Sequence, residues 1–168
     1  MRRWLLAAVA ALSIMSGTTG CMVPHNGITG ITVDNEGHLL GAFAWCDDNP
    51  PDGATLYDPG GFNGKALATY RAPVLSGHTA TVRLDSADGG WQVEPPAPRL
   101  DPDVEYRLYG WTDDDSASTA GVPFHLSDRG RLSAETVLAQ YYDDAGDQWV
   151  TGLVPATAFE HLADIFCR

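Results

Sequence analysis

The chain between residues 28 and 126 consists of short apolar runs separated by turn-forming residues. In the run 78–85, small and branched apolar residues alternate with polar ones, which is the period of a strand with one buried face. In the run 38–46 both alternating sets are apolar, which indicates a central strand covered on both sides. The pattern therefore predicts a mainly β domain. The other predicted strands are 28–33, 54–57, 65–72, 91–94, 107–112 and 119–126.

The first twenty residues have the composition of a secretory signal peptide. Arg2 and Arg3 form a short positive region, and an uncharged apolar stretch follows from residue 4 to residue 15. This stretch is shorter than the about 20 apolar residues that a bilayer-spanning helix needs. We therefore predict that residues 1–20 are a signal peptide, and that no integral membrane segment follows.

Residues 18–21, Thr-Thr-Gly-Cys, resemble the lipobox of bacterial lipoproteins, in which small residues precede a cysteine that receives a diacylglyceryl group. The family usually has leucine where this chain has Thr18. The resemblance implies a mature chain that begins at a lipidated Cys21, with residues 21–27 as a short tether. It also implies a location on the extracytoplasmic face of the cell membrane. The alternative is cleavage by an ordinary signal peptidase, which would leave Cys21 unmodified.

Lys65 is the single lysine among ten basic residues, a composition typical of GC-rich genomes such as those of actinobacteria.

The chain has three cysteines, and exported proteins seldom keep unpaired thiols. With Cys21 used for the lipid, Cys46 and Cys167 are predicted to form one disulfide that closes nearly the whole mature chain. The alternative is that both remain buried free thiols. The chain has no C-x-x-C pair, and no histidine stands at ligand spacing from these cysteines, which argues against a zinc site.

The formal net charge of −12 excludes one class of partner. Binding to nucleic acid needs a basic surface, and the scattered arginines do not supply one. The length of the chain suits a single domain with one core. We place this domain at residues 28–168. The predicted partners are the membrane, through the Cys21 lipid, and an unknown protein or cell-wall component.

Residues 100–106, Leu-Asp-Pro-Asp-Val-Glu-Tyr, precede the predicted strand 107–112. Their L-x-P-x-x-x-Y spacing resembles the start of strand F in fibronectin type III and related immunoglobulin-like domains. In those domains the tyrosine hydroxyl bonds back to the upstream backbone. The resemblance implies a single immunoglobulin-like antiparallel β-sandwich, with residues 113–116 as the turn before the last strand. The cysteine and tryptophan pattern of true immunoglobulin domains is absent.

Two later segments carry helical signals. Residues 132–140, with Ser133 as an N-cap, favour a short helix or a turn. In residues 155–166, Thr157 and Glu160 have the spacing of a capping box. We predict a short C-terminal α-helix there, packed on the sandwich and fixed by Cys167. Its apolar stripe comprises Phe159, Leu162, Ala163 and Phe166.

The chain contains no recognisable catalytic motif. A G-x-S-x-G elbow, an H-E-x-x-H pair, a P-loop and a G-x-G-x-x-G loop are all missing, and no two histidines are four residues apart. We therefore predict no catalytic residues and no cofactor.

Two acidic clusters could present carboxylates to calcium, residues 113–115 and the set Asp143, Asp144 and Asp147. Neither has the spacing of an EF-hand, and solvated turns use consecutive aspartates for the same geometry. No metal site is predicted, and the second cluster is the stronger candidate because Gly146 would let its loop fold round an ion.

Aromatic residues flank both acidic clusters. Trp111 precedes the first, while Tyr141, Tyr142 and Trp149 bracket the second. Such side chains could form a stacking surface for sugars or peptides, or they could close the ends of the core. They are the candidate ligand-binding residues.

Two functions remain open. The first is a membrane-anchored, non-enzymatic binding or envelope-structural lipoprotein of the cell surface. The alternative is a small secreted or anchored envelope hydrolase, or a metal-dependent enzyme, with a site assembled from distant residues. A deep pocket with convergent His, Asp and Ser side chains would favour the enzyme, and a flat acidic surface would favour the binding module.

Overall fold

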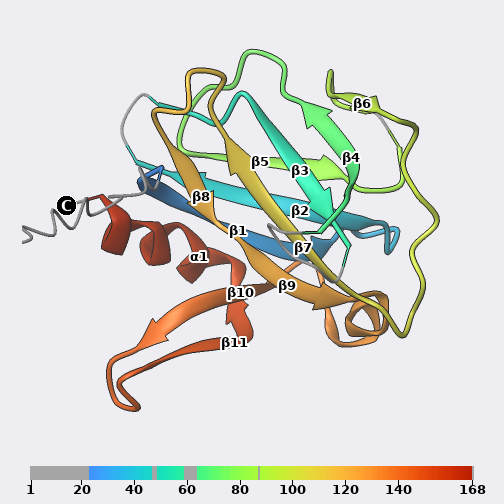
Figure 1. Cartoon of the computed structure of the whole chain (residues 1–168). Coiled ribbons are helices and arrows are strands. Elements are labelled where there is room, and N and C mark those ends of the chain that lie inside the picture. The colour runs from blue at the N-terminus through green and yellow to red at the C-terminus, as the bar shows by residue number, and fades with distance from the viewer. Residues whose placement is uncertain (1–22, 47–48, 59–63, 87, 168) are drawn as a thin grey trace, which may run out of the picture.

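The computed structural model describes residues 23–46, 49–58, 64–86 and 88–167. The predicted signal peptide 1–20 and Cys21 lie outside these residues. Within the described ranges, no helix has the length and apolar character to cross a membrane. The chain forms many strands and a short C-terminal helix (Figure 1), so the mainly β prediction is confirmed.

Each strand predicted between residues 28 and 112 is present, with ends that differ by a few residues. The strands are β1 His25–Val33, β2 Leu39–Trp45, β3 Gly53–Tyr57, β4 Ala66–Arg71, β5 Thr79–Arg83, β6 Gln92–Glu94, β7 Glu105–Trp111, β8 Ser118–Ala120, β9 Val122–His125, β10 Thr136–Asp143 and β11 Gln148–Pro155. A 3-10 turn, η2, follows β9 at Leu126–Arg131. Helix α1 (Ala156–Ala163) and a second 3-10 turn, η3 (Asp164–Phe166), end the described chain.

The strands join into one curled, mixed sheet. Its order runs from β11 through β10, β1, β8, β7, β3 and β4 to β6, while β2 joins β1 to β5 and β9 pairs with β7. Strand β1 is central to this arrangement, because it pairs antiparallel with β2 and β10 and parallel with β8. The curl brings the β1–β2–β5 part across from the part formed by β3, β4, β7 and β9 (Figure 1).

One hydrophobic core lies between the two parts of the sheet. Phe43 of β2 and Leu108 of β7 are fully buried in the same cluster. A Cβ atom placed on Gly41 would lie 2.5 Å from Leu108 Cδ2, so β2 and β7 face each other with no space to spare. Trp91 stacks on Phe43 with 6.0 Å between ring centroids. Burial of each such side chain stabilises the fold by about 1.5–3 kcal/mol.

Strand β2 is buried on both faces, as its apolar pattern predicts. Phe43 and Trp45 face the main core, whereas Ala42 and Ala44 belong to a second cluster beneath α1. The strand pairs with β1 along one edge and with β5 along the other. The small alanine side chains let the helix approach the strand closely. The prediction of a central strand is confirmed.

Tyr106, at the start of β7, makes the backbone bond implied by the spacing of residues 100–106. Its buried side chain directs the hydroxyl to the backbone N–H of Asp101, which donates to it at 2.8 Å. The ring packs on Phe124, with centroids 5.9 Å apart. This bond fixes the chain where it turns into β7.

The predicted last strand, 119–126, is divided into two. β8 pairs with β7 only through Ser118 and Trp111, and otherwise runs parallel to β1. After Gly121 the chain returns to β7 as β9. A Cβ atom on Gly121 would lie 3.0 Å from the carbonyl oxygen of Leu108, so the chain passes close to β7 at this crossing.

Of the two alternatives predicted at 132–140, a short helix or a turn, the turn is formed and the helix is not. A turn at 133–135 leads directly into β10, and Ser133 Oγ accepts the N–H of Glu135 at 3.3 Å. Val137 faces the cluster beneath α1, whereas Leu138 faces the main core. A short strand that is buried on both faces shows no polar alternation, so its sequence resembles that of a buried helix.

The C-terminal helix is present, but its predicted capping box is wrong. The N-cap is Pro155, which has no side-chain hydrogen bond, so Thr157 lies inside the first turn. The predicted stripe does face the sheet, since Phe159 and Ala163 are buried. A Cβ atom on Gly30 would lie 2.8 Å from Phe159 Cε2, which shows how closely the helix packs on β1.

Candidate binding surface on the C-terminal hairpin

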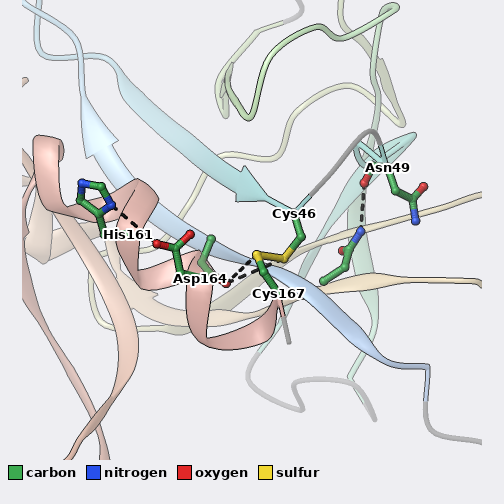
Figure 2. Close-up of a disulfide and its surroundings, with 7 residues drawn as sticks. Cys46, Asn49, His161, Asp164 and Cys167 are labelled. Atoms are coloured by element: carbon green, nitrogen blue, oxygen red, sulfur yellow. Dashed lines mark hydrogen bonds and ion pairs between the residues drawn. A yellow bond between two sulfur atoms is a disulfide. The ribbon is translucent and has the colours of Figure 1, made fainter.

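Cys46 and Cys167 form the predicted disulfide, with Cα atoms 5.3 Å apart (Figure 2). The bond joins the end of β2 to the residue that follows η3. The backbone N–H of Cys46 also donates to the carbonyl of Asn26 at 2.8 Å. The C-terminal segment is therefore held at the end of the sheet where β1 begins.

β10 and β11 form a hairpin that projects from the body of the sheet (Figure 1). Every residue of β10 pairs with β11, whereas only Leu138 and Ala139 of β10 pair with β1. The turn is shaped by its aspartates: Asp143 Oδ1 accepts the N–H of Ala145 at 3.1 Å, and Asp147 has a φ of 51°. Beyond residue 139 the hairpin is therefore stabilised mainly by its own strands and by the C-terminal segment.

Four side chains from the hairpin and η3 form an exposed apolar patch, which we call the aromatic surface: Tyr142, Trp149, Ile165 and Phe166. Trp149 is 51% exposed, Ile165 41% and Tyr142 38%. Tyr142 meets the Trp149 ring edge-on at 5.6 Å, and Phe166 stacks on Trp149 at 6.1 Å. These side chains and Asp144 line a hollow of about 360 Å³. Such a concentration of exposed aromatic area on a small domain is typical of a contact surface.

Polar groups adjoin the aromatic surface on two sides. The Tyr142 hydroxyl donates to Asp147, and this bond raises the pKa of Tyr142. The His25 ring meets Phe166 edge-on at 5.9 Å, and burial lowers the pKa of His25. A second hollow, of about 410 Å³, lies beside Trp149, with His25, Arg107 and Gln140 among its lining residues. The surface thus combines aromatic area with hydrogen-bonding groups.

The structure brings together only two of the four aromatic candidates, Tyr142 and Trp149. Tyr141 points to the other face of the hairpin, where its ring lies against Gly152. Trp111 is in β7, where its indole N–H donates to Thr55 at 2.9 Å and Arg71 lies over its ring. Packing within the domain therefore accounts for Trp111 and Tyr141.

The sequence assigns Phe166 to the buried stripe of the helix and gives Ile165 no role. In the structure both residues lie in the 3-10 turn that follows α1: Phe166 is half-buried and packs on the cluster beneath α1 as well as on Trp149, whereas Ile165 is exposed. The change from α-helical to 3-10 geometry shifts the direction of side chains by about 20° per residue. No pattern in the sequence indicates this change.

Asp143, Asp144 and Asp147 lie in the hairpin turn, where the first and last shape the backbone as described above. Among the residues that the structure describes, a different group brings its potential metal ligands together. The ligand atoms of Asp34, Glu36 and His38 all lie within 4.8 Å of one another. It occupies the β1–β2 turn, where Asp34 accepts the backbone N–H groups of Glu36 and His38.

An open groove of about 730 Å³ lies beside α1. Its floor includes Ala42 of β2 and Thr81 of β5, and Phe159 and Glu160 line its helical side. Asp34 lies at its end, near the β1–β2 turn. Since Asp34 is at the opposite end of β1 from His25, the groove and the aromatic surface are separated along the length of that strand.

No protein-family model, curated protein or solved structure matches this chain.

Proposed function

We propose that this chain is a lipid-anchored binding module of the extracytoplasmic membrane face, which holds a partner through its C-terminal hairpin and carries out no catalysis. The observation that supports this function is the aromatic surface. Tyr142, Trp149 and Ile165 are each more than a third exposed and lie together. Exposed aromatic residues are enriched at the energetically dominant points of protein interfaces.

The N-terminal sequence supports the anchored location. Residues 1–20 have the composition of a signal peptide, and Cys21 follows a lipobox-like sequence. His25, the first residue of β1, comes so soon after Cys21 that the intervening chain can reach at most about 14 Å. A lipid on Cys21 would hold the start of β1, and the nearby hairpin turn, close to the membrane surface.

The strand arrangement supports an immunoglobulin-like sandwich as the scaffold of this module. The set β1–β2–β5 and the set β4–β3–β7–β9 enclose the core, and Tyr106 bonds back to Asp101 at the start of β7. Sandwiches of this kind present binding surfaces at their strand ends and edges. The function itself is argued from the aromatic surface, because a fold of this type serves many functions.

The anchoring is tested by intact mass and membrane partition of the chain expressed in a bacterial envelope. We expect a mature chain that begins at Cys21 with an added diacylglyceryl mass, and release of a Cys21→Ser variant into the soluble fraction. A Cys21→Ser variant that stays fully membrane-bound would show that the lipid is not the anchor.

The binding role is tested by in-cell chemical cross-linking followed by purification. A Tyr142→Ala, Trp149→Ala double variant is expected to lose cross-linked partners that the parent chain retains. The matched control is Val74→Ala, which removes a fully exposed apolar side chain outside the strands. Equal partner recovery from the double variant and the control would rule out the aromatic surface.

A metal-dependent enzyme is the second candidate, favoured by the group Asp34, Glu36 and His38, of which Asp34 lines the groove beside α1. His38 Nδ1 lies 2.8 Å from Asp34 Oδ2, so a metal would have to replace this bond. Calorimetric titration of the parent chain and of Glu36→Gln with Zn²⁺ and with Ca²⁺ discriminates between the two candidates. The metal-dependent enzyme requires a heat of metal binding in the parent chain that the Glu36→Gln variant does not give.

A further inference from the structure

Strand β11 is an open edge of the sheet. It pairs with β10 along one side, and among the described residues no strand pairs with its other side. From Trp149 onward exposed and half-buried residues alternate, and none of its eight residues is fully buried. An open edge presents unpaired N–H and C=O groups in the spacing that another strand requires.

Natural proteins usually protect such edges with charges, prolines or very short strands. The other open edges of this sheet have these devices: β5 ends with Arg83, β6 is three residues long and ends with Glu94, and β9 contains Pro123. β11 is eight residues long, Gln-Trp-Val-Thr-Gly-Leu-Val-Pro, with no charge and with its proline at the last position. In a chain of net charge −12, this uncharged edge is suited to pairing.

The side chains of β11 are complementary to a second copy of the same strand. Trp149, Thr151 and Leu153 lie on one face, because side chains alternate along a strand. Trp149 is 51% exposed and Leu153 40%. If two copies pair antiparallel about Thr151, the residue two positions before it meets the residue two positions after it. Each Trp149 then lies opposite the partner's Leu153, an aromatic and aliphatic pair of the kind that stabilises sheets.

The charges near the hairpin are compatible with this pairing. Asp143, Asp144 and Asp147 are at the turn, and the other end of β11 is Pro155. In an antiparallel pair the two acidic turns lie at opposite ends of the joined strands, about 25 Å apart. This separation exceeds the screening length of about 8 Å at physiological salt. The arrangement therefore keeps the like charges apart.

We propose that β11 pairs with β11 of a second copy of this chain, antiparallel and centred on Thr151, so that the two curled sheets become one across a two-fold axis. The inference rests on the proposed function, in that it names the partner of the C-terminal hairpin. A two-fold axis at Thr151 makes the contact self-complementary and closed, which is the commonest symmetry of soluble oligomers.

The position of the axis is tested by cysteine cross-linking in a Cys21→Ser background, where Cys46 and Cys167 are already bonded. Thr151→Cys places two thiols directly across the axis, with Cβ atoms about 5 Å apart, so mild oxidation is expected to give a covalent dimer. Gln140→Cys is the matched control, because Gln140 is the β10 neighbour of Thr151 and its two copies would lie about 14 Å apart. The proposal is overturned if Gln140→Cys forms the covalent dimer. It is also overturned if Gly152→Cys cross-links more readily than Thr151→Cys.

The strength of the contact is tested by sedimentation equilibrium of the same Cys21→Ser protein. It is expected to be dimeric, and Thr151→Lys is expected to weaken the dimer about tenfold or more by opposing two like charges at the axis. Thr157→Lys adds the same charge at an exposed position of α1 and should leave the dimer intact. A monomeric parent chain, or equal effects of the two lysines, overturns the proposal. A third outcome is a monomeric parent chain together with a Tyr142→Ala, Trp149→Ala variant that loses its in-cell partners. The binding function would then stand, and its partner would be a molecule other than a second copy of this chain.

Discussion

Replacing both Cys46 and Cys167 with serine is expected to lower the free energy of unfolding by about 5 kcal/mol. The two residues are 121 positions apart, and the value follows from the chain entropy that a closed loop of that length removes from the unfolded state. Both sulfur atoms lie near the carbonyl oxygen of Ala163, at 3.8 and 3.2 Å, so serine hydroxyls at these positions have an acceptor. The cost is therefore confined mainly to the lost cross-link.

Urea unfolding of the double variant, of the oxidised parent and of the reduced parent measures this effect. The double variant and the reduced parent should agree, and the thermal midpoint should fall by roughly 10–20 °C for a domain of this size. A loss below about 1 kcal/mol would refute the reasoning, because it would mean that the unfolded state gains little freedom when the bond is removed.

Three further predictions concern single residues. Phe159→Ala, which empties the contact between α1 and β1, should cost about 3–5 kcal/mol in urea unfolding, and a cost below about 1 kcal/mol would contradict the packing. Tyr106→Phe keeps the ring but removes the acceptor for Asp101 N–H; a loss of about 1 kcal/mol is expected, and an unchanged midpoint would contradict it. Burial lowers the pKa of His25 below its ordinary 6.5, so the unfolded chain binds more protons as the pH falls through that value, and stability should decrease. Thermal melts between about pH 7.5 and 5.5 should show a shallower decrease for His25→Gln, and identical profiles would exclude His25 as a contributor.

The strands that could be predicted are those whose pattern has a single physical explanation. In residues 38–46 both faces are apolar, and turn-forming residues stand before and after the segment. A central strand therefore accounts for the whole pattern. Tyr106 could be predicted because its bond depends on local spacing. The pairing of Cys46 with Cys167 followed from the number of cysteines rather than from any feature of the fold.

The C-terminal hairpin could not be predicted from the same rules. β10 is buried on both faces by contacts with β1 and α1, which are distant in sequence, and this removes the alternation that identifies a strand. β11 alternates in exposure but not in polarity, because Trp149 and Leu153 are apolar on one face and Val150 and Val154 on the other; its glycine and proline weaken the strand signal further. Once the hairpin is known, Tyr142 and Trp149 follow as direct cross-strand neighbours. Their contact with Phe166 depends on the turn after α1, which the sequence does not indicate.

The disulfide also determines what happens to the chain after proteolysis. Val74 is fully exposed in the segment between β4 and β5, within the loop that Cys46 and Cys167 close. A single cut there produces two fragments that remain covalently joined, and the strands of each stay paired with strands of the other. The nicked protein would migrate as one species on a non-reducing gel and separate only on reduction. A chain with this closure can therefore lose an exposed peptide bond without releasing its C-terminal hairpin from its N-terminal end.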